Sequence, residues 1–364
     1  MSQESLSAIL GFDYFSYIGM STFIISALVA IEMYILKKKG NSFHFEDALS
    51  SIACGIVSTA LIFLIFPLQP LTHFIHDKVA FFDMSRLSNW QMLVAGIFPI
   101  FAVDHSYYWG HRFCHVWNIG WVAHAAHHQS ERMTFTTSLR NASFQPYFLF
   151  FFQVICVIIG FPVAWFISNI SMIVAFQFWL HTETVRKMPA WFEWLFNTPS
   201  HHRVPHASDA IYLDKNFAGI FVIWDRLYGT FESETVNAHY GTVQKIESWN
   251  PVWVQFEHLA KTFRFAVASR SLRTFASIWF QAPAALEGND SPYLAEPPLS
   301  PKAGHSSTRG RIESIAYLIL AIVLMSAAAV AESIPIRIGL FALFIVSLVQ
   351  VGRSLDRSML GAEA

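Results

Sequence analysis

Charged side chains are scarce in this chain of 364 residues: Asp, Glu, Lys and Arg together make up only 13%. A soluble domain of ordinary composition carries about 25%. Hydrophobic residues make up 54%, and the mean hydropathy is +0.40. This composition argues against a soluble enzyme and favours a protein that spans a membrane. The formal net charge of −1 also gives no reason to expect a nucleic acid as partner.

Cysteine is scarce as well. Cys54, Cys114 and Cys156 are too few and too scattered for a disulfide framework or for a metal site built from thiolates. Cys54 and Cys156 lie in apolar runs, and Cys114 lies among histidines, where we expect it to pack rather than to bind a metal. Any metal site in this chain must therefore use other ligands.

Long runs with little or no charge account for the composition. About 20 apolar residues cross a bilayer as a helix, so the longer runs predict single spans or helical hairpins, and the runs of 14 and 16 residues are marginal spans. The alternative is that these runs are buried helices of a large soluble core. The runs are 12–36, 52–67, 90–103, 144–180 and 315–350.

Basic residues orient these runs. Lys37, Lys38 and Lys39 follow the first run, which places its carboxyl end in the cytoplasm by the positive-inside rule. We then take the second run as crossing outward and the third as crossing back. Run 144–180 is taken as an in-out-in hairpin that turns near Gly160 and so crosses the membrane twice. Every histidine-rich segment comes out on the cytoplasmic side. The sequence thus predicts a multi-pass integral membrane protein.

The fold class expected is all-α: a polytopic integral-membrane helical bundle with a cytoplasmic cap that holds two metal ions. Residues 1–100 are expected to form N-terminal transmembrane helices, and 101–270 a catalytic region with three histidine boxes. Residues 271–311, rich in proline, are expected to form a linker. Residues 312–364 are expected to form C-terminal transmembrane helices.

Ten of the sixteen histidines lie between positions 105 and 206, mostly in three spaced boxes: 111–115, 124–128 and 201–206. Residues three or four positions apart share one face of a helix, so His111 and His115 can hold the same ion. For the same reason His124, His127 and His128 are expected on one helical stripe. The candidate metal ligands are His111, His115, His124, His127, His128, His181, His201, His202 and His206.

These ligands are all imidazoles, which suit iron, zinc or copper and disfavour magnesium or calcium. A single catalytic zinc uses three protein ligands, far fewer than are present here. Two ions that share about eight nitrogens fit better. The ligands leave iron, zinc and copper open; two iron ions are the pair that could use O2, and zinc is an alternative occupant in the purified protein. With positions open for O2, such a centre could attack an unactivated C–H bond, and the membrane setting implies a lipid substrate.

Carboxylates near the boxes are candidates for the catalytic site, because a metal-bound imidazole needs an acceptor on its other nitrogen. Asp104, Glu131, Glu183, Asp209 and Asp225 are available. Asp104 is the strongest candidate, since it borders an apolar run, where an unpaired carboxylate would be costly.

At these residues the chain resembles the fatty acid hydroxylase/sterol desaturase superfamily of integral-membrane, histidine-box oxygenases, and within it the alkylglycerol monooxygenase-like branch. The resemblance covers about residues 100–235 and implies a helical membrane fold, a cytoplasmic di-iron centre, O2 as co-substrate and lipid C–H oxidation. Carried over by position, it implies that all the candidate histidines except His201 are ligands. The similar stretches are 104–115, 124–131, 177–183, 197–204, 214–216 and 224–231.

One departure from the family pattern lies in the third box, where the family usually has a histidine pair and this chain reads Pro205-His206. Proline offers no nitrogen ligand, and residues 201–205 cannot form an unkinked helix interior. Either His201 substitutes as a ligand through a bent backbone, or one metal position is weaker than usual.

The leading hypothesis is a di-iron monooxygenase that hydroxylates an ether lipid, an acyl chain, a sterol or a lipid head group. No haem or flavin fingerprint is present, so the reductant is expected from outside: a tetrahydropterin, as the resemblance implies, or a cytochrome or ferredoxin. Two alternatives remain open. One is a zinc-dependent membrane hydrolase with Glu131 or Glu183 as the base, and the other is a non-catalytic metal-binding membrane protein.

Overall fold

The computed structural model describes residues 14–40, 44–62, 67–87, 91, 98–243, 246–283 and 306–360. Within these residues no β-strand forms, and the two isolated bridges join Phe196 to Phe221 and Ala207 to Tyr240. The predicted all-α class is confirmed.

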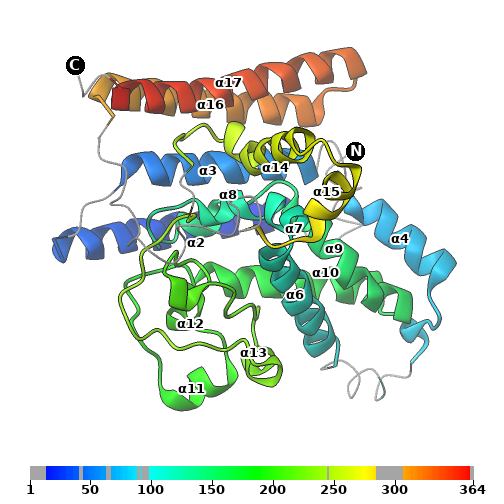
Figure 1. Ribbon diagram of the computed structural model, residues 1–364. Helices are drawn as coiled ribbons and strands as arrows, with labels where there is room; N and C mark the ends of the chain where they lie inside the picture. Colours follow the sequence, from blue (N-terminus) through cyan, green and yellow to red (C-terminus); the bar gives the residue numbers. More distant parts are fainter. Residues whose placement is uncertain are drawn as a thin grey trace.

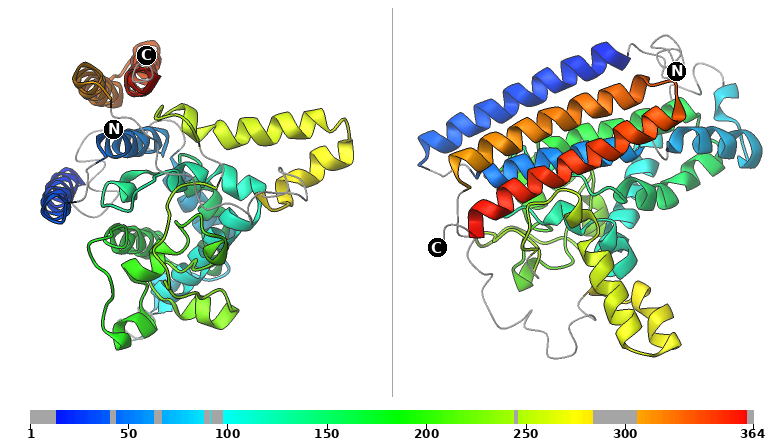
Figure 2. Two further views of the ribbon diagram at one scale, coloured as in Figure 1. Left: turned by 60° about the vertical axis from the view of Figure 1, so that its left-hand side comes forward. Right: turned by 90° about the horizontal axis from the view of Figure 1, so that it is seen from above.

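The long helices α2, α3, α16 and α17 run side by side, and the short helices α11, α12 and α13, joined by loops, lie at the opposite side of the molecule (Figures 1 and 2). The α-helices are α2 (Tyr14–Lys38), α3 (Phe45–Ala60), α4 (Leu68–Val79), α6 (Phe98–Val116), α7 (Asn118–Val122), α8 (Ala125–His128), α9 (Gln145–Ile159), α10 (Val163–Phe178), α11 (Ala190–Leu195), α12 (Pro199–Arg203), α13 (Ile223–Tyr228), α14 (Glu257–Ala268), α15 (Leu272–Ser277), α16 (Thr308–Val330) and α17 (Ile334–Leu360). The 3-10 turns are η2 (Met84–Arg86), η3 (Thr137–Leu139), η4 (Ala210–Tyr212), η5 (Trp253–Gln255) and η6 (Ile278–Phe280).

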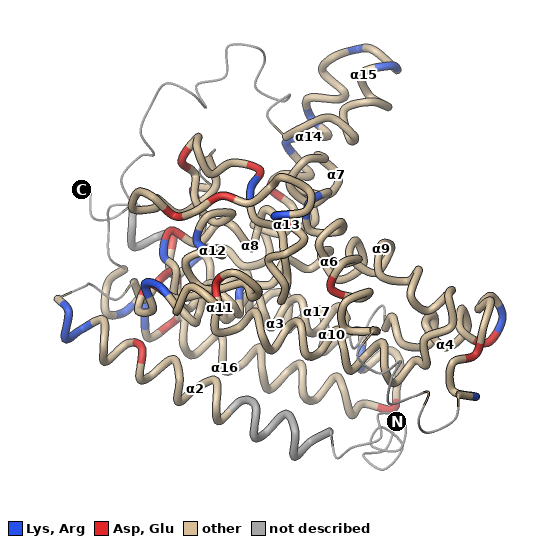
Figure 3. The backbone as a smooth tube through the Cα atoms, turned by 90° about the horizontal axis from the view of Figure 1, so that it is seen from below, with Lys and Arg blue, Asp and Glu red and all other residues tan. Residues whose placement is uncertain are grey.

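Two of the described helices are long and apolar enough to cross a bilayer: Thr308–Val330 and Ile334–Asp356, each 23 residues. Only 22% of either window is buried, so most of their side chains are at least partly exposed, which favours membrane helices over core helices of a soluble protein. Figure 3 shows α2, α16 and α17 almost free of charge along most of their length. The larger number of spans expected from the sequence stays a prediction.

The helical hairpin expected within 144–180 is present, and its turn falls at Gly160. Gly160 has a φ of 120°, and a Cβ there would lie 2.1 Å from the carbonyl oxygen of Phe82, so only glycine fits. However, α9 and α10 have 15 and 16 residues. At 1.5 Å per residue they rise only about 22–24 Å, too short to cross a core of about 30 Å and return. The in-out-in crossing is therefore not favoured.

The expected linker differs from the structure at its start. Residues 272–280 form α15 and η6, which fold back beside α14. Residues 284–305 lie outside the described part of the chain.

Two apolar cores hold these helices in place. In one, the α16–α17 hairpin packs on α3 through Ala53, Leu318, Phe344 and Leu348. The second core joins α6, α9 and α10. Because α6 is packed there along its length, its last two turns are held rigidly where the histidine boxes begin.

Candidate metal centre

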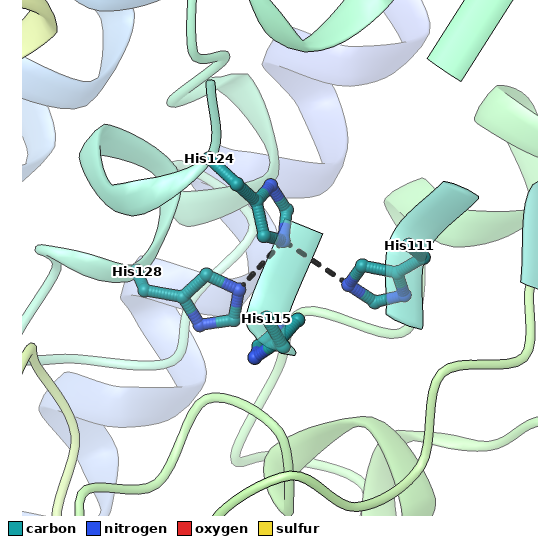
Figure 4. Close-up of side chains that lie close together, drawn as sticks. All are labelled: His111, His115, His124 and His128. Atoms are coloured by element: carbon teal, nitrogen blue, oxygen red, sulfur yellow. Dashed lines mark hydrogen bonds between the residues drawn. The ribbon is translucent and has the colours of Figure 1, made fainter. Parts of the chain in front are cut away.

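Eight of the nine candidate histidines converge in two groups, and within each group the ligand atoms lie within 4.8 Å of one another. The first histidine group consists of His111, His115, His124 and His128, and the second of His127, His181, His202 and His206. Figure 4 shows the first group, with short nitrogen–nitrogen contacts from His124 to His111 and to His128.

Two helices, α6 and α8, supply the first group. His111 and His115 are one turn apart on α6, as the sequence predicts. His124 is the N-cap of α8, and His128 is its last residue. The first group therefore depends on the close approach of α6 and α8.

The second box differs from its prediction. The single stripe expected for His124, His127 and His128 does not form, because α8 has only four residues. His127 turns into the second group, where His181 and His202 meet it. The short helix α8 therefore contributes a histidine to each group.

The two groups are neighbours. The ring centroids of His128 and His206 are 4.3 Å apart, and those of His127 and His128 are 5.2 Å apart. Two ions held by these groups would share one buried chamber, which a centre of two cooperating metals requires.

The nitrogens of the second group have the chemistry of cation ligands. Nδ1 of His127 lies 2.9 Å from the carbonyl oxygen of Arg140, and Nδ1 of His181 lies 2.8 Å from that of Gln177. A carbonyl only accepts, so both Nδ1 atoms carry the hydrogen and both Nε2 atoms keep a lone pair. These two Nε2 atoms are nevertheless only 3.3 Å apart. Two facing lone pairs repel unless a cation lies between them.

The first group follows the same logic. Nδ1 of His111 lies 2.9 Å from the carbonyl oxygen of Phe217, and its Nε2 lies 3.1 Å from Nε2 of His124. Nε2 of His115 is buried and has no hydrogen-bond partner among the described residues. Two nitrogens bound at about 2.1 Å to one ion lie about 3.0–3.4 Å apart. The observed spacing thus fits a metal ion in each group.

Burial keeps these imidazoles neutral. None of the eight side chains is more than 8% exposed. Burial is the main cause that lowers the pKa of His111 and of His127 to about 4. It also lowers the pKa of His202 and His206 well below the usual value for histidine. Neutral imidazole is the form that binds a metal.

Asp104 lies in the site region but binds backbone rather than an imidazole. Its fully buried carboxylate accepts hydrogen bonds from the backbone N–H groups of Ile220 (2.7 Å) and Phe221 (3.0 Å) and from Nε1 of Trp224 (3.0 Å). A Cβ on Gly219 would lie 2.4 Å from this carboxylate, so glycine is needed there. Asp104 thereby anchors the 217–221 loop.

Asp225 holds the other side of the same loop. Its carboxylate accepts from the backbone N–H groups of Phe217 (2.8 Å) and Ala218 (2.9 Å) and from the Thr230 hydroxyl (2.7 Å). Since the carbonyl of Phe217 orients His111, Asp225 acts on the first group through one peptide unit. The acceptors of His111, His127 and His181 are thus backbone carbonyls, where the sequence predicts carboxylates.

The remaining candidate carboxylates lie farther out. Glu183 accepts from the backbone N–H of Met133 at 3.2 Å, while its own N–H donates to the Met133 carbonyl. Asp209 caps the backbone of His239 at the exposed edge. Glu131, only partly buried, belongs to neither histidine group.

Two buried arginines were not anticipated from the sequence. Arg140, fully buried, donates to Asp47 (3.2 Å), Ser51 (3.1 Å) and Gln129 (2.7 Å), while its carbonyl receives the His127 hydrogen bond. It ties α3 to the metal centre. Only the scarcity of charge in this chain could have singled it out.

Arg203 has the corresponding role in the second group. It forms a buried ion pair with Glu234 at 2.6 Å and donates to the carbonyls of Thr182 and Val185. Because Thr182 follows His181, this arginine joins α12 to the His181 segment.

His201 lies outside both groups. Its ring packs edge-on against Phe231, with the centroids 5.2 Å apart, so it does not substitute for a missing ligand in this arrangement. Pro205 ends α12 and lines a pocket of about 200 Å³ together with His115, His128, Trp121 and Leu213. This pocket reaches the first group.

Comparison with known proteins agrees with the site. Residues 96–230 match the family model for fatty acid hydroxylase. Alkylglycerol monooxygenase of Homo sapiens is 33% identical over 273 residues, 73% of this chain and 59% of that protein. Alkylglycerol monooxygenase of Xenopus tropicalis is 30% identical over 276 residues, 74% of this chain and 60% of that protein.

This chain spans about three fifths of the length of these two relatives. No solved structure matches it. The histidine boxes thus lie in a segment that matches the fatty acid hydroxylase family model, which confirms the predicted resemblance to the fatty acid hydroxylase/sterol desaturase superfamily.

Proposed function

We propose that this protein is a membrane-bound monooxygenase that hydroxylates a lipid with O2 at a di-iron centre. The observation that supports it most is the pair of adjacent, buried histidine groups, within a segment of the fatty acid hydroxylase family. The relatives are named alkylglycerol monooxygenases, which favours an ether lipid over an acyl chain, a sterol or a head group as substrate.

In this proposal each histidine group holds one iron ion. When bound, the two ions supply the redox chemistry in which a C–H bond, O2, two electrons and two protons give C–OH and water. The electrons come from outside the chain, from a tetrahydropterin or from a cytochrome or ferredoxin.

The chain's own residues prepare this centre. The carbonyls of Phe217, Arg140 and Gln177 orient three imidazoles before any ion binds. Burial excludes bulk water from the chamber. The pocket beside His115 and His128 gives a substrate access to the first group.

The membrane location is part of the proposal. In this proposal the exposed apolar helices α16 and α17 serve as spans, and the lysines at the end of α2 favour the cytoplasmic side for that end. Glu32, one and a half turns before Lys38, accepts from the backbone N–H of Phe135 at 2.6 Å and from the Thr182 hydroxyl. The His181 segment is thereby held near the cytoplasmic end of α2.

The test is turnover of defined lipids by the purified full-length protein with isotope-labelled O2 and each class of reductant. We expect an oxygen atom from O2 in the product. Product formation without O2 would support the zinc-dependent hydrolase instead. Metal binding without any lipid product would support the non-catalytic alternative.

Two adjacent residues give a matched pair of variants for the same assay. His202→Asn is expected to lose the ion of the second group and to reduce turnover by more than about tenfold. His201→Asn, whose ring lies outside both groups, is expected to keep the metal content and most of the turnover. Equal metal loss in both variants would contradict the assignment.

A further inference from the structure

A second lipid-binding feature lies outside the metal centre. Residues 257–280 form α14, α15 and η6, which we call the α14–α15 arm. The left view of Figure 2 shows this arm (yellow) projecting from the body of the protein, roughly at right angles to the axes of α16 and α17, which are seen almost end-on. If α16 and α17 cross the membrane, the arm runs along the membrane plane.

The arm is anchored at its base by one buried residue. Asn118, at the start of α7, bonds to His258 at 3.1 Å and donates to the carbonyl of Ile278 at 2.8 Å. These partners lie at the beginning and at the end of the arm. Thr262 and Ala266 are also buried, so one face of α14 packs on the protein.

The other face of the arm is apolar and exposed. Leu272 is 90% exposed. Five further large apolar side chains in this short stretch are exposed as well: Phe263, Phe265, Val267, Phe275 and Phe280. So many exposed large apolar side chains in a stretch this short are costly in water and indicate a membrane or a partner.

The charges of the arm favour a membrane over a partner protein. Beyond Glu257, residues 258–280 contain no acidic residue, but they contain Lys261, Arg264, Arg270 and Arg273. The three arginines are exposed among the apolar side chains. Apolar residues interleaved with basic residues are typical of helices that lie in the head-group layer of an anionic membrane.

The arm also leads to the metal centre. The first turn of α14 contributes Glu257, His258 and Lys261 to the pocket that contains His115 and His128. A helix held in the head-group layer would therefore set the height of this pocket relative to the lipids.

We propose that the α14–α15 arm lies in the head-group layer of the cytoplasmic leaflet, with its apolar side chains at the acyl boundary and its arginines on anionic lipid head groups. This inference rests on the proposed membrane location but not on the proposed reaction. A bilayer is the occupant it names, and not a second protein.

The experiment measures the depth of a spin label at Leu272→Cys in the full-length protein, reconstituted in vesicles with and without anionic lipid. The native cysteines are buried, so labelling should be confined to the new site. The reference sites are Ile319→Cys, exposed midway along α16, and Val236→Cys, exposed on the histidine-box side. Depth is read from collisions with O2 and with a water-soluble nickel chelate.

We expect the label at position 272 to lie between the two references and to move deeper when anionic lipid is present. Arg264→Gln, Arg270→Gln and Arg273→Gln should each shift the ratio of lipid-seated to aqueous label by about fivefold toward water. Since depth is measured and not turnover, the result is independent of metal and of substrate.

Two outcomes would overturn the proposal. A label at position 272 that is as aqueous as at position 236, with position 319 in lipid, would remove the arm from the membrane. Dipolar broadening at position 272 that disappears on dilution with unlabelled protein would assign this surface to a second copy of the chain. An aqueous label at position 319 would instead refute the membrane location itself.

Discussion

A backbone carbonyl sets the proton position of each oriented imidazole in this centre. At His127, for example, the Arg140 carbonyl keeps the hydrogen on Nδ1 and leaves the Nε2 lone pair for a cation. A carbonyl cannot take up a proton at neutral pH, so this orientation does not depend on a titrating neighbour. Among the described residues, the carboxylates of Asp104 and Asp225 bind no imidazole directly. They hold the 217–221 loop, whose Phe217 carbonyl orients His111.

The first prediction concerns Asp104. Its two oxygens accept from three donors, so Asp104→Asn would place an amide N–H against a buried N–H. We expect a loss of about 1–3 kcal/mol in the free energy of unfolding, measured in detergent. Asp209→Asn, at the exposed edge, is the control and should change it by less than about 0.5 kcal/mol. Equal losses in the two variants would contradict the anchoring role.

The second prediction concerns Pro205. Each group already contains four histidines, and Pro205 lines the pocket instead of joining either group. We therefore expect Pro205→His to leave the metal content per chain unchanged and to alter only lipid turnover, because the pocket changes shape. A rise in bound metal, measured by elemental analysis, would show that the position is a missing ligand.

At the scale of the element, α12 contributes His202 but is only five residues long, too short to be stable alone. Arg203 holds it through Glu234 and the carbonyls after His181. The short helix is thus positioned by its ion pair and not by its own helix propensity.

This arrangement gives the third prediction. Arg203→Met removes the buried member of the ion pair and leaves three backbone carbonyls and the partly buried Glu234 without their donor, which should cost about 3–5 kcal/mol in the free energy of unfolding. The ion of the second group should be lost before that of the first. Glu234→Gln keeps a hydrogen-bond acceptor for Arg203. It should therefore cause a smaller loss in the free energy of unfolding and a smaller loss of the second group's ion. Simultaneous loss of both ions in Arg203→Met would contradict a separate role for α12.

The helices that contain the histidines also show how much of the site the sequence could predict. Imidazole spacing along one helix was enough to pair His111 with His115, and the carry-over by position named the eight histidines that converge. Spacing alone could not assign His127 and His128 to different histidine groups, because that assignment depends on where α8 ends. The acceptors were missed because a backbone carbonyl leaves no trace in residue type.

At the scale of the whole molecule, the buried imidazoles make stability depend on pH. Free histidine titrates near 6.5, whereas burial lowers the pKa of His111 and His127 to about 4. Between these values the unfolded chain binds protons that the folded chain does not. Stability is therefore complete above about pH 6.5 and falls as pH decreases toward 4.

The fourth prediction follows for the metal-free protein. His111 and His127 should each remove up to about 1.4 kcal/mol of stability per pH unit between about pH 6.5 and pH 4. The midpoint of thermal unfolding in detergent should thus fall steeply between pH 6.5 and pH 5. A midpoint that stays constant over this range would show that the histidines are solvated.

The family match begins at residue 96, but the buried charge of Arg140 is satisfied from outside it, by Asp47 and Ser51 of α3. Glu32 of α2 likewise holds Phe135 from outside. A fragment trimmed to the matched segment, 96–230, would leave the Arg140 guanidinium in the interior with no counter-ion. The boundary drawn by homology is therefore not a boundary of cooperative folding, and an excised domain should be recovered only as aggregate.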